Sequence, residues 1–128
     1  MKVLGRLPPE QGIAAMQSIN IVVLNPWFFT AFFGTAAVCV ILAGYALFHW
    51  HLHAASYLLA GSVLYLAGVI VVTVAFNVPL NEALATVKPT SAAGAELWSR
   101  YLSVWTGWNH VRTATPLLAA AAFIMALV

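Results

Sequence analysis

Two long stretches without a charged residue limit the fold of this chain more than any other feature. Residues 26–50 and 54–76 contain no Asp, Glu, Lys or Arg, and each spans roughly 35 Å as an α-helix. The hydrocarbon core of a bilayer is about 30 Å thick, so each stretch is long enough to cross it. The chain is 63% hydrophobic and only 6% charged, which excludes an ordinary soluble domain. The sequence therefore predicts an integral membrane protein.

A third segment, residues 96–127, is apolar only in its second half. It ends in LLAAAAFIMALV but begins with the polar stretch WSRYLSVWTGWNHVRTATP. As one helix it is long enough to cross a bilayer and to project from one side. We therefore expect a single domain over residues 1–128, an all-α bundle of three transmembrane helices.

The connections between these segments carry helix-breaking signals. Pro8, Pro9 and Glu10 suit the first turn of a helix, and Asn25-Pro26 should end it, which predicts a short interfacial or re-entrant helix at the N-terminus. No apolar stretch with a cleavage site follows Met1, so we expect no removable signal peptide. Pro79 should break or kink the second span and free carbonyl groups. Residues 83–94 have the composition of a loop.

The few charges indicate an orientation. Lys2, Arg6, Lys88 and Arg100 lie before the first span or between the second and the third, whereas the turn near His51 has no Lys or Arg. The positive-inside rule then places both basic segments in the cytoplasm and the C-terminus outside. No basic run indicates a nucleic-acid partner, and the single cysteine excludes an intrachain disulfide.

The stretch His49-Trp50-His51-Leu52-His53 has two interpretations. Three imidazoles can bind zinc or copper in principle. However, no Cys, Asp or Glu lies nearby, and the stretch falls where a helix hairpin must turn at the water interface. We therefore favour solvated histidines over a metal site.

The polar half of the third segment is the main clue to function, because charged and polar groups at membrane depth are costly and usually mark a site. At helical spacing, Trp98, Trp105, Asn109, Arg112 and Pro116 form one stripe, with Tyr101 and Trp108 on its edge. Ser99, Ser103, Thr106, His110 and Thr113 form a neighbouring stripe. We expect both stripes to face the protein interior. Alternatively, Arg112 and His110 only hold the helices together by bonding Asn77, Asn81 or backbone carbonyls.

Several motifs together resemble the DUF1772 family of small membrane proteins, also called the anthrone oxygenase-like family. They are LPPEQGIAAMQSIN (7–20), LNPWF (24–28), NVPLNEALA (77–85) and WSRYLSVWTGWNHVRT (98–113). Family members usually have four helices, with an apolar span upstream of the LPP segment, and this chain begins where that span should end. The resemblance implies a protein of the bacterial cytoplasmic (inner) membrane. For the fungal relatives it implies oxidation of anthrones by molecular oxygen without a cofactor.

The residues suit that chemistry. Deprotonation of an anthrone needs a base, and His110 is the obvious one because an ordinary imidazole titrates near neutrality. Arg112, with Asn109 or with Asn77 and Asn81, can hydrogen-bond the enolate oxygen. Trp105 and Trp108 can stack on a planar substrate, and Tyr101 lies beside them.

A second interpretation needs no base. The same pocket could belong to a non-catalytic membrane module that binds a lipophilic molecule or a partner membrane subunit. Such a module would tolerate His110→Gln. A transporter is disfavoured because the chain has no internal repeat. The sequence leaves open whether the protein forms homo-oligomers.

Overall fold

The computed structural model describes all 128 residues, which form helices and no strands. The elements, in chain order, are η1 (Leu4–Arg6), α1 (Pro9–Val22), α2 (Pro26–Phe48), α3 (His53–Tyr65), η2 (Leu66–Val71), η3 (Thr73–Asn77), α4 (Val78–Thr86), α5 (Ala92–Arg100), η4 (Tyr101–Trp105) and α6 (Thr106–Met125). The short element η1 is a 3₁₀-helix, whereas η2, η3 and η4 are π-helical turns.

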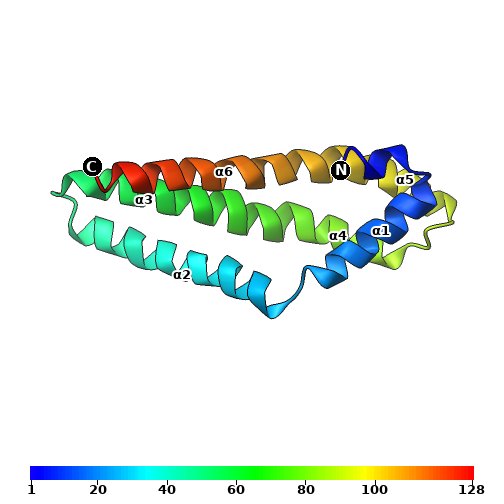
Figure 1. Ribbon diagram of the computed structural model, residues 1–128, viewed down its shortest axis with the longest axis horizontal. Coiled ribbons are helices and arrows are strands. Elements are labelled where there is room, and N and C mark those ends of the chain that lie inside the picture. Colours follow the sequence, from blue (N-terminus) through cyan, green and yellow to red (C-terminus); the bar gives the residue numbers. More distant parts are fainter.

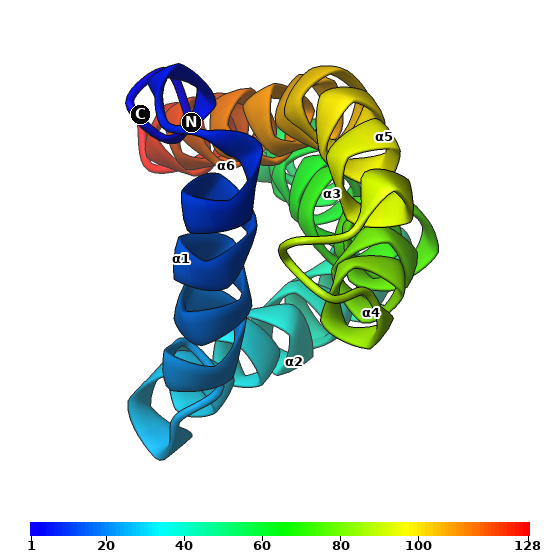
Figure 2. The same ribbon diagram turned by 90° about the vertical axis from the view of Figure 1, so that its right-hand side faces the viewer.

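Three long rods make up the molecule (Figure 1). The first rod is α2, the second runs without a break from α3 to α4, and the third runs from α5 to α6. The element α3 packs against both α2 and α6, so the second rod lies in the middle. At the other end, α1 packs across α5 and α4 (Figure 2).

The ends of the helices follow local signals. Asn25 caps α2, because its side-chain oxygen accepts a hydrogen bond from the Phe28 backbone N–H at 3.0 Å, and Pro26 occupies the first turn. The predicted break before the first span is therefore confirmed. Residues 49–52 form the predicted turn between α2 and α3. Ser91 caps α5 by accepting from the Gly94 N–H at 3.0 Å.

Two predicted boundaries were wrong. The second rod does not break at Pro79, which was one of the two outcomes expected there, but continues to Thr86. The predicted loop over residues 83–94 shrinks to residues 87–91. Pro79 lies in the first turn of α4, directly after the π-helical η3. A proline lacks only one donor and needs space for its ring, and a wide π turn supplies that space. The third rod begins at Ala92 instead of Glu96 because Ser91 caps it.

Two helices are long and apolar enough to cross a membrane. Pro26–Phe48 has a mean hydropathy of 2.1 and His53–Thr86 one of 2.4. The third rod is long enough but not apolar enough by the same measure, because its polar half lowers its mean hydropathy. The rods do bring both predicted basic segments to one end of the molecule, and the C-terminus lies at the other end, beside the α2–α3 turn (Figure 1).

Close contact between the second and third rods depends on glycine. A Cβ added at Gly61 would lie 2.7 Å from the Phe123 ring, and one at Gly68 would collide with the Thr115 side chain. The third rod therefore packs directly on the backbone of the second, as small residues allow in membrane helices. The main cluster of large buried side chains lies at the other end and comprises Ile13, Met16, Leu84, Trp98, Tyr101 and Trp105.

Candidate functional site

The two polar stripes of the third rod have different environments. Trp98, Tyr101 and Trp105 are buried, and Asn109 and Arg112 are half-buried. The prediction of an inward face is confirmed for this first stripe. It was wrong for the second, in which Thr106 is half-buried and the other members are exposed: Ser99, Ser103, His110 and Thr113. The packing on α6 comes mainly from the second rod, through α3, η2 and η3, which covers only one side of the helix.

Wide helical turns on both rods meet at the centre of the site. The η3 turn ends at Asn77 and the η4 turn ends at Trp105. Asn77 is fully buried, and its Nδ2 donates to the Trp105 backbone carbonyl at 3.3 Å. This bond joins the second rod to the third. Such π turns interrupt α-helices frequently at functional sites.

Two buried polar atoms beside this bridge have no partner within the chain. They are the Asn77 side-chain oxygen and the Trp105 indole nitrogen. A buried polar group without a hydrogen bond costs roughly 1–3 kcal/mol, so such atoms are uncommon in a structural core. The centre of the site therefore keeps unused hydrogen-bonding capacity.

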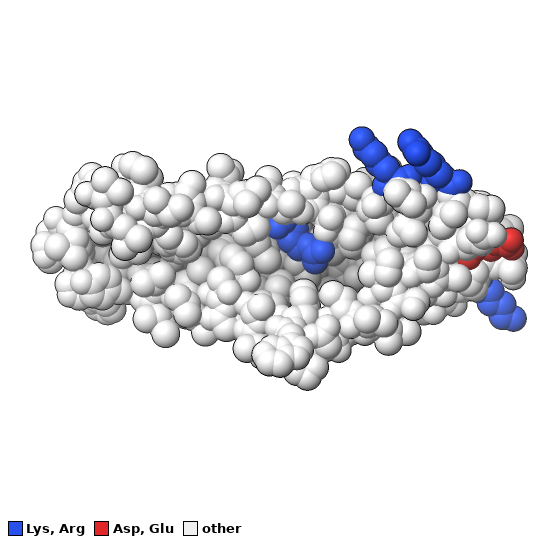
Figure 3. Space-filling view, viewed as in Figure 1, with Lys and Arg blue, Asp and Glu red and all other residues white.

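Arg112 is a half-buried cation with only neutral partners. Its Nη2 donates to the Asn109 side-chain oxygen at 2.6 Å, and its Nη1 donates to the Thr73 hydroxyl at 3.5 Å. The guanidinium carbon lies 5.9 Å from the centre of the Trp105 ring. The three acidic residues of the chain, Glu10, Glu82 and Glu96, are all exposed elsewhere. Figure 3 shows one cationic side chain in a hollow halfway along the molecule, apart from the charges gathered at one end.

The bond from Arg112 fixes the orientation of the Asn109 amide. A guanidinium only donates hydrogen bonds, so the atom that receives its bond must be the amide oxygen. The Nδ2 group of Asn109 therefore points away from Arg112, and it has no partner within the chain. Asn109 presents a free donor on the side opposite to the cation.

His110 lies on that other side, in a recess of about 720 Å³. The recess lies between the third rod and the N-terminal residues. Its lining comprises Met1, Lys2, Val3, Gly5, Arg6, Leu102, Thr106, Asn109 and His110. Asn109 thus connects the two parts of the predicted site, because it lines the recess of His110 and binds Arg112 behind it.

Tyr101 and Asn81 form a separate polar contact nearer the end of the molecule. The Tyr101 hydroxyl donates to the Asn81 side-chain oxygen at 2.6 Å. Asn20 and Asn81 line a second recess, of about 450 Å³, between α1 and α4. Of the predicted site residues, Asn109 and His110 therefore line the first recess and Asn81 lines the second. The others line neither: Asn77, Tyr101, Trp105, Trp108 and Arg112.

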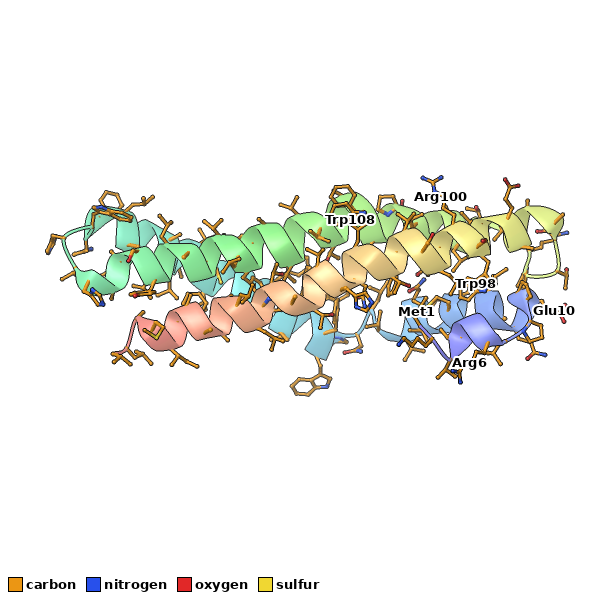
Figure 4. All side chains as sticks on the ribbon, turned by 90° about the horizontal axis from the view of Figure 1, so that it is seen from above. Met1, Arg6, Glu10, Trp98, Arg100 and Trp108 are labelled. Atoms are coloured by element: carbon orange, nitrogen blue, oxygen red, sulfur yellow. The ribbon has the colours of Figure 1, made fainter.

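The two predicted stacking indoles are engaged with protein side chains. Trp105 stacks on Tyr101, with ring centres 5.3 Å apart, and Trp108 stacks on Phe76 at 3.8 Å. Figure 4 shows Trp108 and Trp98 on different sides of the third rod. The Trp108–Phe76 contact joins the third rod to the second, whereas Tyr101 and Trp105 lie one turn apart on the third rod. Stacking on a substrate stays a prediction.

The histidines of the α2–α3 turn do not converge. The His49 ring stacks on Tyr45, with ring centres 4.2 Å apart, and lies 6.2 Å from the His51 ring. His53 instead packs edge-on against Tyr57. Nowhere in the chain do three His, Cys, Asp or Glu side chains gather in an arrangement that could hold a metal ion.

The sequence model of the anthrone oxygenase family matches residues 27–122. The chain belongs to this family. The match covers three-quarters of the chain and all three rods for most of their length, so the family predicted from the motifs is confirmed. No curated protein and no solved structure matches the chain.

The family match includes every residue that the sequence predicted for the site, from Asn77 to Arg112. Two residues that the structure adds were missed. Thr73 precedes Asn77 by four residues, so the spacing of Thr73, Asn77 and Asn81 along one helix face could have indicated it. Asn20 lies in α1, outside the matched range, and only the fold brings it to the recess that Asn81 lines.

Proposed function

We propose that this member of the anthrone oxygenase family is a membrane enzyme that oxidises a lipophilic aromatic ketone with molecular oxygen, without a cofactor. The observation that carries the proposal is the Arg112–Asn109–His110 arrangement. A half-buried cation without a carboxylate partner holds the amide oxygen of Asn109, and Asn109 lines a recess that contains an imidazole. Family membership supports an oxygenase role but leaves the substrate to be identified.

We place all three rods across the bilayer, in the bacterial cytoplasmic membrane. The apolar surface of α2 supports this part of the proposal, because Trp27 and Phe48, near its two ends, are 86% and 87% exposed. Aromatic side chains gather at both membrane interfaces, and a water-soluble protein would bury such residues. The third rod can cross because its polar first stripe faces the other helices.

In the proposed reaction, His110 removes a proton from the methylene carbon opposite the ketone. The ketone oxygen then carries the negative charge of an enolate, and the free Nδ2 of Asn109 donates a hydrogen bond to it. Arg112 donates to Asn109 and does not line the recess, so in this proposal it acts as a positioning residue that also polarises the amide. A recess of about 720 Å³ has room for a three-ring substrate.

The overall reaction balances with oxygen as the only oxidant. The enolate gives two electrons to O₂ and forms a carbon–oxygen bond. One oxygen atom becomes the new carbonyl group, and the other leaves as water with the two methylene hydrogens. An anthrone and O₂ thus give an anthraquinone and water, while His110 returns the proton that it removed.

Oxygen uptake tests the proposal. We would purify the chain in detergent, add emodin anthrone, and compare the wild type with His110→Gln. His53→Gln is the matched control, because His53 is also an exposed histidine but lies at the start of α3, outside the recess. Protein-free samples measure spontaneous oxidation. We expect uptake above that background in the wild type and the control, and uptake at background in His110→Gln.

Two results would contradict the proposal. Turnover that survives His110→Gln in a folded protein would exclude His110 as the base. A transition metal that stays bound stoichiometrically after chelation would exclude the cofactor-free reaction. Uptake at background in all samples would instead favour the non-catalytic binding module.

A further inference from the structure

The second recess, between α1 and α4, has the character of a ligand site. Its walls carry apolar side chains from Ile21, Val23, Leu24 and Val78, and its volume of about 450 Å³ falls in the range of small-molecule pockets. The two helices face each other across this end of the molecule (Figure 2). None of its lining residues also lines the recess of His110, so the two recesses are distinct.

The Asn81 side chain, which lines this recess, is held in place by a hydrogen bond from a buried tyrosine. The Tyr101 hydroxyl donates to the Asn81 side-chain oxygen at 2.6 Å. Tyr101 is itself fully buried between two indole rings, stacked on Trp98 at 5.6 Å and on Trp105 at 5.3 Å. The amide oxygen of Asn81 is therefore committed, and its Nδ2 group, which has no partner within the chain, remains a donor for the recess.

A further contact keeps the walls of the recess together. The Gln17 side chain of α1 donates to the backbone carbonyl of Leu84 at 2.8 Å and to that of Val87 at 3.1 Å. It thereby ties α1 to the end of α4. This bond makes Gln17 part of the frame and leaves Asn20 and Asn81 as the amides that can meet a ligand.

The charged residues in the lining of this recess restrict the class of ligand that it can bind. Glu82 is the only charged residue in the lining, and no Lys, Arg or His lines the recess. An anion would meet a carboxylate without a compensating cation, which disfavours fatty acids and phosphates. A neutral molecule with an apolar body and one hydrogen-bond acceptor matches the walls and the amide donor.

We propose that this recess binds a neutral lipophilic molecule through a carbonyl oxygen, which accepts a hydrogen bond from the Asn81 amide. A free quinone or ketone can supply that carbonyl, and so can the ester group of a phospholipid. The site is separate from the proposed catalytic recess, so it does not depend on turnover.

Saturable quenching of tryptophan fluorescence by menadione tests this proposal in detergent. A bound quinone would quench Trp98 and Trp105, because both stack on the Tyr101 ring behind the recess. Collisions with exposed tryptophans give only a linear background. The hydrocarbon 2-methylnaphthalene, which lacks the carbonyl groups, should not compete with menadione. A parallel titration with added phosphatidylcholine shows whether a phospholipid ester competes for the recess.

Two variants make the test specific. Asn81→Asp keeps an acceptor for the Tyr101 hydroxyl but removes the donor, and we expect menadione affinity to fall at least tenfold. Val78→Trp fills the recess and should abolish saturable quenching. Val71→Trp is the matched control, because Val71 is exposed on the same rod and outside the recess. Gel filtration and circular dichroism confirm that each variant is folded.

The outcomes separate cleanly. Saturable quenching that Asn81→Asp weakens and Val78→Trp removes supports the site, and competition by phosphatidylcholine identifies a lipid ester as the source of the carbonyl. Non-saturable quenching in the wild type together with no effect of phosphatidylcholine would overturn the proposal. An equal affinity for menadione in the wild type and in Asn81→Asp would also overturn it. So would an affinity for menadione that is lost in His110→Gln but kept in Val78→Trp, because the ligand would then bind in the other recess.

Discussion

If Arg112 acts only through Asn109, the two residues should not contribute independently to oxygen uptake. Removing the guanidinium with Arg112→Met eliminates the 2.6 Å bond to the Asn109 oxygen, a charge-assisted bond of about 1.5–3 kcal/mol. If that energy is realised in the transition state, kcat falls by about 10- to 150-fold. Arg112→Lys restores one donor and should recover part of the loss.

A variant with both substitutions, Arg112→Met and Asn109→Leu, tests whether Arg112 acts through Asn109. Asn109→Leu removes the donor to the enolate and should lower kcat by about 10²- to 10³-fold, as measured for a comparable amide in an oxyanion hole. Adding Arg112→Met to Asn109→Leu should then cost almost nothing more, because the group that Arg112 orients is already absent. Oxygen-electrode kinetics with emodin anthrone measure all four proteins. If the losses in kcat of the two single variants multiply in the double variant, Arg112 does not act through Asn109 but contacts the substrate directly.

Three further predictions concern stability and reactivity. Tyr101→Phe removes one buried hydrogen bond and should lower the free energy of unfolding by about 1 kcal/mol, measured by denaturant titration in detergent; no change would exclude a structural role for that bond. Gly68→Ala should cost about 1–3 kcal/mol because the methyl group collides with Thr115, whereas Gly44→Ala, with no atom within 4 Å, should not destabilise the protein. Equal effects would refute the close contact. Cys39 is buried and should react with a maleimide only after unfolding, so rapid labelling of the native protein would contradict its position.

Much of the architecture was predictable because it depends on local properties of the chain. The apolar stretches and the Asn25-Pro26 signal predicted the first rod and its start, and the helical spacing of Trp98, Trp105 and Arg112 predicted the face that packs inward. Pro79 misled the prediction because its effect depends on the turn that precedes it. An ordinary α-turn would clash with the ring, whereas the wide η3 turn accommodates it.

The candidate site was less predictable because it depends on contacts between distant residues. The bond from Asn77 to the Trp105 carbonyl joins residues 28 positions apart, and the bond from Tyr101 to Asn81 joins residues 20 apart. Periodicity along one helix ranks its faces by polarity but does not show which neighbour covers each face. The second polar stripe was therefore assigned to the interior, although it is exposed.

The sequence by itself determined that the chain forms long apolar helices, which family it resembles, and which residues carry the polar chemistry. Hydropathy, helix caps and motifs are properties of neighbouring residues, and they survive in the unfolded chain. Only the tertiary structure decided that His110 is exposed and lines a recess beside the N-terminal residues, and that Asn81 belongs to another recess. Those assignments follow from how three rods and α1 pack, because a helix with few neighbours must leave part of its surface uncovered.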